Sequence, residues 1–176
     1  MSPFISKPPY PNNYGPDFLV LDKGEGVYLY DKKGNKYLDF GSGISVNSLG
    51  YGREDIAKIA YDQMKKLIHV SNLFATEPAV ELAEKLTHSG DFDAVHFGNS
   101  GTEANEAAFK YARAYSKRIK GDDAYKILSF SEGFHGRTFG TMSATPKEKY
   151  KAPFYPLVPG FLTTEYNNVQ QLEDIL

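Results

Sequence analysis

Apolar and polar residues alternate near the N-terminus in a way that predicts a β-hairpin. Within residues 26–40, apolar and aromatic side chains lie on both sides of the polar, glycine-containing segment 31–35, as in two antiparallel strands joined by a turn. The next segment, Gly41-Ser42-Gly43, breaks the strand pattern and is either a plain bend or a close approach of the backbone to a ligand. Residues 1–16 contain five prolines, so we expect no regular structure there. This segment is either an arm that lies on another surface or a frayed terminus.

Further along the chain, apolar residues recur every three or four positions, which is the spacing of one helix face. The pattern predicts four helices, over residues 53–69, 76–89, 104–120 and 168–176. Thr76 and Asn168 are the predicted N-caps of the second and fourth helices, and Gln171 would complete a capping box with Asn168. The acidic last turn and the absence of a following glycine lead us to expect that the chain ends inside the fourth helix.

Two short apolar runs, Ala94–Phe97 and Ile127–Phe130, flank the third predicted helix. A strand, a glycine-containing turn, a helix and a second strand make a βαβ unit. Such a unit predicts a parallel sheet with a right-handed crossover, and the fold class is therefore α/β.

Composition narrows the class of protein. The 176 residues suffice for one domain or for one domain and part of another, and 41% apolar and 24% charged residues are typical of a soluble globular chain. A net charge of −2 gives no electrostatic reason to expect nucleic acid or an acidic membrane as a partner. The sequence has no cysteine, no long apolar run and no secretory signal, so we expect a cytoplasmic protein. His88 and His96 lack partners at metal-ligand spacing, so we expect no metal site.

The first cluster that could carry chemistry is the segment 99–103, Asn-Ser-Gly-Thr-Glu, between the first apolar run and the long helix. Free backbone N–H groups at the helix start make an anion site, Gly101 allows a phosphate to come close, and Ser100 or Thr102 could add a hydroxyl. The alternative is an ordinary capping box, in which Ser100 caps the helix and Glu103 reaches back. Neither the P-loop pattern nor the dinucleotide fingerprint occurs in the sequence.

The second cluster is the segment 133–138, Gly-Phe-His-Gly-Arg-Thr, directly after the second apolar run. Arg137 could bind a carboxylate with two hydrogen bonds, and Phe134 and His135 could stack on a planar ring. Taken singly, Phe134 could instead be core, His135 could hydrogen-bond the turn and Arg137 could be a surface base. Ligands of open α/β sheets bind beyond the carboxyl ends of the strands, so both clusters would face one crevice.

At these two clusters the chain resembles the class III pyridoxal-phosphate-dependent aminotransferases. The resemblance rests on GNSGTEANEAAFKYAR at residues 98–113 and FHGRTFGTMSAT at residues 134–145. The segments 28–50, 69–74 and 152–161 are similar to the acetylornithine branch of the family. The resemblance implies fold type I, the aspartate aminotransferase-like fold. It also implies pyridoxal 5'-phosphate as the cofactor.

The resemblance also implies a role for particular residues. Gly101 and Thr102, with Ser100 beside them, would bind the cofactor phosphate. Phe134 would stack on the pyridine ring next to His135. Two residues would contact the substrate, Arg137 at its α-carboxylate and Asn72 near the active site at a dimer interface.

For the whole protein, the resemblance implies a homodimer that acts on small amino-acid and 2-oxo-acid substrates. It would move an amino group between N-acetylornithine and 2-oxoglutarate in arginine biosynthesis, with ornithine and 4-aminobutyrate as other amine substrates within the family. Residues 1–50 would be the arm and hairpin of a small domain, 51–75 a connecting helix and interface segment, and 76–176 the incomplete start of the large, mainly parallel-sheet domain.

The sequence departs from the family pattern in two ways. Where the family usually has His-x-His-Pro, this chain has Tyr51-Gly52-Arg53-Glu54, and no role is carried onto those positions. The family's Schiff-base lysine and the aspartate that pairs with the pyridinium nitrogen lie downstream of residue 176, so no catalytic residue is assigned. The chain is therefore expected to be the N-terminal portion of a transaminase, or alternatively a catalytically inactive truncated product or an interaction module.

Overall fold

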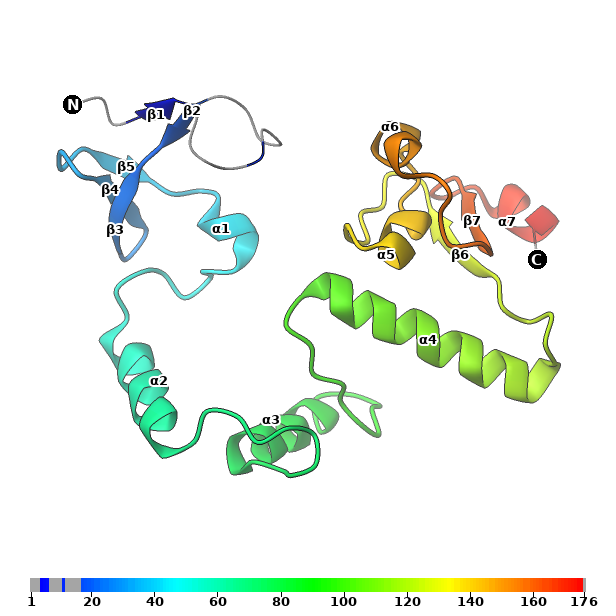
Figure 1. The fold of residues 1–176 in the computed structure, drawn as a ribbon, viewed down its shortest axis with the longest axis horizontal. Coiled ribbons are helices and arrows are strands. Elements are labelled where there is room, and N and C mark those ends of the chain that lie inside the picture. Colours follow the sequence, from blue (N-terminus) through cyan, green and yellow to red (C-terminus); the bar gives the residue numbers. More distant parts are fainter. Residues whose placement is uncertain (1–3, 7–10, 12–16, 176) are drawn as a thin grey trace. The chain divides into compact units, whose positions relative to one another are not determined.

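The computed structural model describes residues 4–6, 11 and 17–175, and the chain forms two compact units, Met1–Thr76 and Glu77–Leu176 (Figure 1). Among the described residues, the first unit has two sheets and the second has one, and each unit has its own helices. No helix in the described part of the chain is long and apolar enough to cross a membrane. The assignment of residues 1–50, 51–75 and 76–176 to parts of a longer enzyme stays a prediction.

The first unit contains two small antiparallel sheets. Strand β1 (Phe4–Ser6) pairs with β2 (Asp17–Leu19), and a second sheet has the order β3 (Leu21–Glu25), β4 (Tyr28–Asp31), β5 (Lys36–Leu38). Strands β4 and β5 confirm the predicted hairpin, and β3 adds a strand that the alternation did not indicate. The expectation of no regular structure in residues 1–16 is wrong for β1, because three residues between prolines suffice for a short pairing. Most of the predicted arm lies outside the described residues.

The turn of the hairpin is held by one carboxylate. Asp31 is only 3% exposed, and its oxygens accept hydrogen bonds from Lys33 N (2.8 Å), Asn35 N (3.0 Å), Asn35 Nδ2 (2.8 Å) and the Tyr37 hydroxyl (3.0 Å). Burial by itself would raise the pKa of Asp31, but the hydrogen bonds from Asn35, Tyr37 and Lys33 together lower it. The ionised carboxylate therefore closes the turn.

The bend after β5 is held from within the same unit. Residues 42–45, called α1 (Ser42–Ser45), form one turn with positive φ angles at Ser42, Ile44 and Ser45. Asp39 Oδ1 accepts hydrogen bonds from the backbone N–H groups of Gly41 (2.8 Å) and Ser42 (3.0 Å). These contacts fit the interpretation of this segment as a bend.

Helix α2 (Glu54–Lys66) confirms the helix predicted over residues 53–69. Its apolar side chains Ile56, Ile59 and Met64 are nevertheless exposed. The periodicity thus predicted the helix correctly without showing what its apolar face packs against.

The second unit contains two longer helices followed by a small parallel sheet. The helices are α3 (Glu77–Thr87) and α4 (Gly101–Lys120), and both were predicted. Strand β6 (Ile127–Phe130) pairs in parallel with β7 (Phe161–Thr164). The crossover between them consists of α5 (Phe139–Ala144), α6 (Glu148–Lys151) and the 3₁₀ turn η1 (Ala152–Phe154).

The predicted strand at Ala94–Phe97 is wrong, because these residues form no strand in the structure. A strand needs a partner, and within the described residues β6 pairs only with β7. A parallel sheet was thus predicted correctly, but the partner of Ile127–Phe130 is Phe161–Thr164 and not Ala94–Phe97.

Helix α7 (Val169–Ile175) confirms the predicted cap at Asn168, whose Oδ1 accepts a hydrogen bond of 3.0 Å from Gln171 N. The Gln171 side chain does not reach back to complete a capping box. It accepts hydrogen bonds instead from the Thr164 hydroxyl (3.0 Å) and from Glu165 N (2.6 Å), and so joins α7 to the end of β7.

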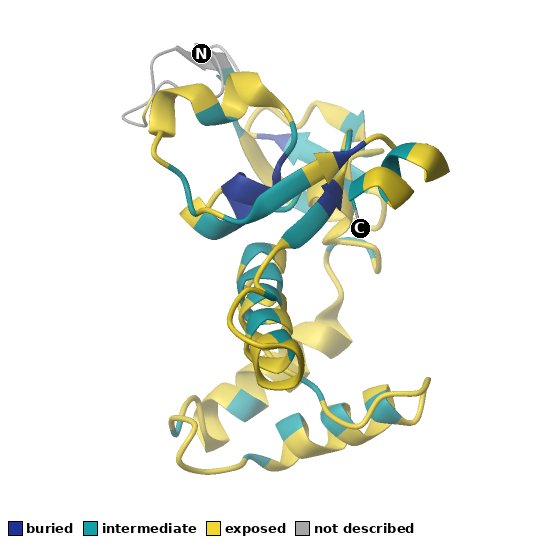
Figure 2. Ribbon diagram, turned by 90° about the vertical axis from the view of Figure 1, so that its right-hand side faces the viewer, coloured by how far each residue is buried: buried dark blue, intermediate teal, exposed yellow. Residues whose placement is uncertain are grey.

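Most buried residues of the second unit lie on α5, β6 and β7, and the others are Gly136 in the loop before α5 and Thr145 directly after it; buried segments are dark blue in Figure 2. Most of them carry hydroxyls that are hydrogen-bonded; the Ser129 hydroxyl, for example, donates to Ala144 O at 2.7 Å. Arg113 of α4 donates to the carbonyls that precede the two strands, Tyr125 O (3.0 Å) and Pro159 O (2.7 Å). Helix α4 is thereby fixed against the start of the sheet.

Candidate functional site

The N-terminus of α4 begins with a capping box. Ser100 is the N-cap, its Oγ accepts from Glu103 N (3.3 Å), and its hydroxyl donates to Glu103 Oε2 (3.0 Å). Hydrogen bonds from the side chains of Asn99 and Ser100 lower the pKa of the Glu103 carboxyl. The capping alternative is therefore confirmed, and the Ser100 hydroxyl is occupied by Glu103.

The same helix start keeps the features of an anion site. Within the described part of the chain, the backbone N–H groups of Gly101 and Thr102 donate to no protein acceptor. A Cβ atom at Gly101 would have no heavy atom within 4 Å, and both Gly101 and Thr102 line a cavity. Capping and anion binding are thus compatible here, because they use different N–H groups of one helix end.

The loop 133–138 lies directly against the first turn of α4. Gly136 is buried with a φ of 130°, and a Cβ there would overlap the Thr102 hydroxyl oxygen and lie 2.6 Å from Thr141 Oγ1. Only glycine allows this close approach. The Thr102 and Thr141 hydroxyls are hydrogen-bonded at 2.9 Å across the contact.

The side chains on either side of Gly136 present an aromatic face and a positive charge. Phe134 is 64% exposed, and the guanidinium carbon of Arg137 lies 5.3 Å from its ring centroid. No carboxylate among the described residues forms an ion pair with Arg137. A flat ring and a planar, unpaired cation are therefore available next to the open helix start.

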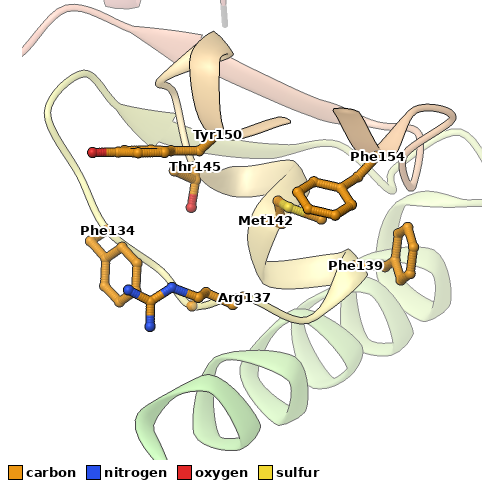
Figure 3. A pocket seen from close by; sticks show the side chains of 8 residues that line it. Phe134, Arg137, Phe139, Met142, Thr145, Tyr150 and Phe154 are labelled. Atoms are coloured by element: carbon orange, nitrogen blue, oxygen red, sulfur yellow. The ribbon is translucent and has the colours of Figure 1, made fainter. Parts of the chain in front are cut away.

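Two cavities meet at this loop. One, of about 350 Å³, is lined by seven residues: Gly101, Thr102, Asn105, Phe134, His135, Gly136 and Arg137. The other, of about 480 Å³, shares Phe134, Gly136 and Arg137 and extends to Met142, Tyr150 and Phe154 (Figure 3). The two sequence clusters thus face one crevice, as predicted, although only the second of them follows a strand.

Five of the seven predicted site residues line the smaller cavity, and the other two do not. Ser100 is next to the cavity in sequence, but its hydroxyl binds Glu103. Asn72 is an exposed residue of the first unit. His135 lines the cavity, yet its Nε2 is buried without a hydrogen-bond partner in the described part of the chain.

The prediction missed several residues that support the site. Asn105, Glu106, Thr138 and Thr141 connect α4 to the loop and to α5. A signal for two of them was present, since Asn105 and Glu106 follow Gly101 and Thr102 by four positions and so share their helix face. Among the described residues, no group of three or more acidic or histidine side chains could hold a metal ion.

In chemical terms, the crevice combines two free N–H donors, an exposed aromatic face and an unpaired guanidinium. The N–H donors suit a phosphate, the aromatic face suits a planar ring, and the guanidinium suits a carboxylate. The arrangement therefore fits a phosphorylated planar ring beside a carboxylate-bearing partner.

Several curated proteins that resemble this chain are named acetylornithine aminotransferases. A probable mitochondrial one from Dictyostelium discoideum is 45% identical over 167 residues, which are 94% of this chain and 37% of that protein. One from Lactococcus lactis is 49% identical over 164 residues, which are 93% of this chain and 42% of that protein. The chain thus spans about two fifths of the length of these relatives.

Among solved structures, the ornithine aminotransferase from Toxoplasma gondii matches with a TM-score of 0.85 and 28% identity. The match covers 93% of this chain and 39% of that protein, whose active site holds PLP at partial occupancy. The predicted α/β fold of type I is confirmed by this match. The family described as aminotransferase class-III matches residues 9–175, and the chain belongs to this family.

Proposed function

We propose that these residues belong to an acetylornithine-type aminotransferase and form part of its pyridoxal 5'-phosphate site. The observation that carries the proposal is the single cavity lined by Gly101, Thr102, Phe134 and Arg137. These residues come from two segments more than 30 positions apart, and each has a chemistry that one part of the cofactor–substrate pair requires.

The phosphate would bind at the start of α4. The free N–H groups of Gly101 and Thr102 and the positive end of the helix supply the donors and the charge. Because Glu103 occupies the Ser100 hydroxyl, the backbone rather than that side chain would make the main contacts.

The exposed ring of Phe134 would stack on the pyridine ring and hold it in one plane. When bound, pyridoxal phosphate supplies a conjugated ring that stabilises negative charge developing on the substrate carbon. Stacking would keep water from that face of the ring, and Gly136 lets the loop that carries Phe134 lie against α4.

Arg137 would bind the α-carboxylate of the amino-acid substrate. Its guanidinium can make two parallel hydrogen bonds to a carboxylate, which orients the substrate as well as attracting it. Within the described residues no carboxylate competes for this group.

The names of the curated relatives favour acetylornithine as amino donor. We further propose 2-oxoglutarate as the acceptor and arginine biosynthesis as the pathway. Ornithine and 4-aminobutyrate are the alternatives within the family, and the Toxoplasma match supports ornithine less strongly because its identity is lower. The whole protein would act as a homodimer with Asn72 at the interface. A cytoplasmic location stays a prediction, since the Dictyostelium relative is named as mitochondrial.

Binding of pyridoxine 5'-phosphate to the 176-residue chain tests the cofactor site, because this analogue carries the phosphate and the ring but no aldehyde. We expect it to bind at least tenfold more tightly than pyridoxine, and Phe134→Ala to weaken it about tenfold. Lys110→Ala, on an exposed turn of α4, is the matched control. Equal affinity for pyridoxine and its phosphate would overturn the proposed site.

The amino donor is tested in the longer protein that contains these residues. Turnover of N-acetylornithine with 2-oxoglutarate is expected to exceed that of ornithine or 4-aminobutyrate. Arg137→Lys should raise KM for the amino acid at least tenfold while changing cofactor affinity less than twofold, because only the carboxylate contact is altered. A longer protein without transamination activity would favour the inactive product or interaction module.

A further inference from the structure

We propose that the adjacent residues Asn105 and Glu106 of α4 are positioning residues that hold both ends of the loop carrying Phe134 and Arg137. The inference deepens the proposed function and rests on it for the identity of the ligand. Neither residue was assigned a role from the sequence. Both lie one helical turn after Gly101 and Thr102, on the same helix face.

Asn105 holds the first end of the loop. Its Nδ2 donates a hydrogen bond of 2.7 Å to the backbone carbonyl of His135, 30 positions further along the chain. Because that carbonyl directly follows Phe134, the contact fixes the backbone from which the aromatic ring projects. The side chain of Asn105 also lines the smaller cavity.

Glu106 holds the second end. Its Oε1 accepts a short hydrogen bond from the Thr138 hydroxyl and one of 3.3 Å from the backbone N–H of Thr141. The second donor belongs to the first turn of α5, whose N-cap Thr138 makes no capping bond of its own. Glu106 therefore accepts from an N-terminal backbone N–H of α5, as an N-cap side chain usually does, although Glu106 belongs to another helix.

The close fit at Gly140 restricts this contact further. A Cβ there would overlap Glu106 Oε2, so the backbone of α5 lies directly on the carboxylate. The end of the loop thus has little freedom to shift along α4. Arg137 lies between this hold and the hold at His135.

A chain of hydroxyl hydrogen bonds also leads from Glu106 back to Thr102. The Thr138 hydroxyl donates to Glu106 Oε1. The Thr141 hydroxyl lies 2.8 Å from that of Thr138 and 2.9 Å from that of Thr102, and it also donates to Thr138 O at 3.3 Å. These hydroxyls thus link the first turn of α4 to the end of the loop and to α5.

The contacts of Asn105 and Glu106 fix the position of the Phe134 ring and the Arg137 guanidinium relative to the phosphate-binding N–H groups at the start of α4. Gly101 and Thr102 lie on α4 itself, while Phe134 and Arg137 reach it only through the loop. Removal of either hold should therefore affect ligands that span both parts of the site more than ligands that touch α4 alone.

A ligand-free experiment tests the hold itself. In ¹⁵N-labelled chain, Glu106→Ala should speed hydrogen exchange of the Thr141 amide at least tenfold. The Ser131 amide, which donates to Thr164 O at the end of the sheet, should change less than threefold. Glu106→Gln keeps an acceptor oxygen and should restore protection of Thr141, while Lys110→Ala should have no effect.

If Glu106→Ala does not fold, Thr138→Val tests the same contact with a smaller perturbation. It removes one donor to Glu106 and should expose the Thr141 amide by a smaller factor. Asn105→Asp is the isosteric change at the other hold, and it should shift the His135 and Gly136 signals because a carboxylate cannot donate to the carbonyl. Unchanged exchange of Thr141 in a folded Glu106→Ala or Thr138→Val variant would overturn the proposal.

A comparison of two ligands tests the consequence for the site. Glu106→Ala should weaken pyridoxine 5'-phosphate at least tenfold but inorganic phosphate less than twofold, because inorganic phosphate touches only the start of α4. Equal loss for both ligands would argue against a positioning role. If the unaltered chain fails to bind pyridoxine 5'-phosphate, the proposed function fails, while the exchange of Thr141 still decides whether Glu106 holds the loop.

Discussion

The hairpin of the first unit and the site of the second are both organised by a carboxylate, but over very different distances along the chain. Asp31 binds groups two to six positions away, at Lys33, Asn35 and Tyr37. Glu106 binds groups 32 and 35 positions away, at Thr138 and Thr141. The hairpin can therefore form from its own residues, whereas the site exists only after α4, the loop and α5 have come together.

Gly136→Val should break the site most severely. The new side chain would overlap Thr102 and would have to adopt a φ of 130°, which β-branched residues avoid. We expect a loss of about 3 kcal/mol or more in the stability of the second unit. The hairpin signals of residues 28–38 should be unchanged, and thermal unfolding with segment-resolved hydrogen exchange measures both.

Gly101→Ala is the matched control, because a Cβ at Gly101 meets nothing within 4 Å. It should change stability by less than about 1 kcal/mol. If both glycine variants unfolded alike, the close approach at Gly136 would not be the cause.

Asp31→Ala should break the hairpin while leaving the site intact. The substitution removes the acceptor for three backbone or amide N–H groups and for the Tyr37 hydroxyl. Cross-strand NMR contacts between β4 and β5 should disappear, and the Thr141 amide should keep its protection. Loss of that protection as well would show that the two regions do not fold independently.

Lowering the pH should destabilise the hairpin of the unaltered chain more than that of the Asp31→Asn variant. The pKa of Asp31 in the folded chain is lower than its ordinary value of 3.8, so its contribution to stability is complete above that value. The contribution is lost as the pH falls through the folded pKa. Between about pH 5 and about pH 2.5, the hairpin contacts should weaken more in the unaltered chain than in Asp31→Asn, whose side chain does not titrate.

Asn168→Ala should have the smallest effect, since it removes one N-cap at the start of α7. We expect a loss of about 1 kcal/mol, confined to α7 and the adjoining end of β7. Asn168→Ser should restore most of it. An effect on the loop 134–138 would contradict the expectation that loss of this cap affects only the residues next to it.

The difference between contacts that are near and far along the chain also explains which elements could be predicted from the sequence. The hairpin, α2, α3, α4 and the cap at Asn168 were predicted because each depends on residues within a few positions of one another. The strand predicted at 94–97 was wrong because apolar residues indicate burial but do not identify a partner strand. Strand β3 was missed because its residues, Leu-Asp-Lys-Gly-Glu, show no alternation.

For the site, the two glycine-containing segments were recognisable, and they do share a crevice, although the strand expected before the first of them is absent. The supporting residues were not predicted. Within a helix, Glu106 is indistinguishable from a solvated acid, and nothing in the sequence indicates that its oxygen meets Thr138. The sequence allowed the Ser100 hydroxyl either to bind an anion or to take part in a capping box. Only the geometry shows that it donates to Glu103.

The contacts of Arg113 have a consequence for the order in which the second unit assembles. One guanidinium binds carbonyls 12 and 46 positions away, each just ahead of a strand. Formation of α4 shortens the conformational search for strands that would otherwise have to close a long loop before gaining any pairing. Docking of the helix and pairing of β6 with β7 should therefore occur in one kinetic step, and Arg113→Ala should slow folding more than it speeds unfolding.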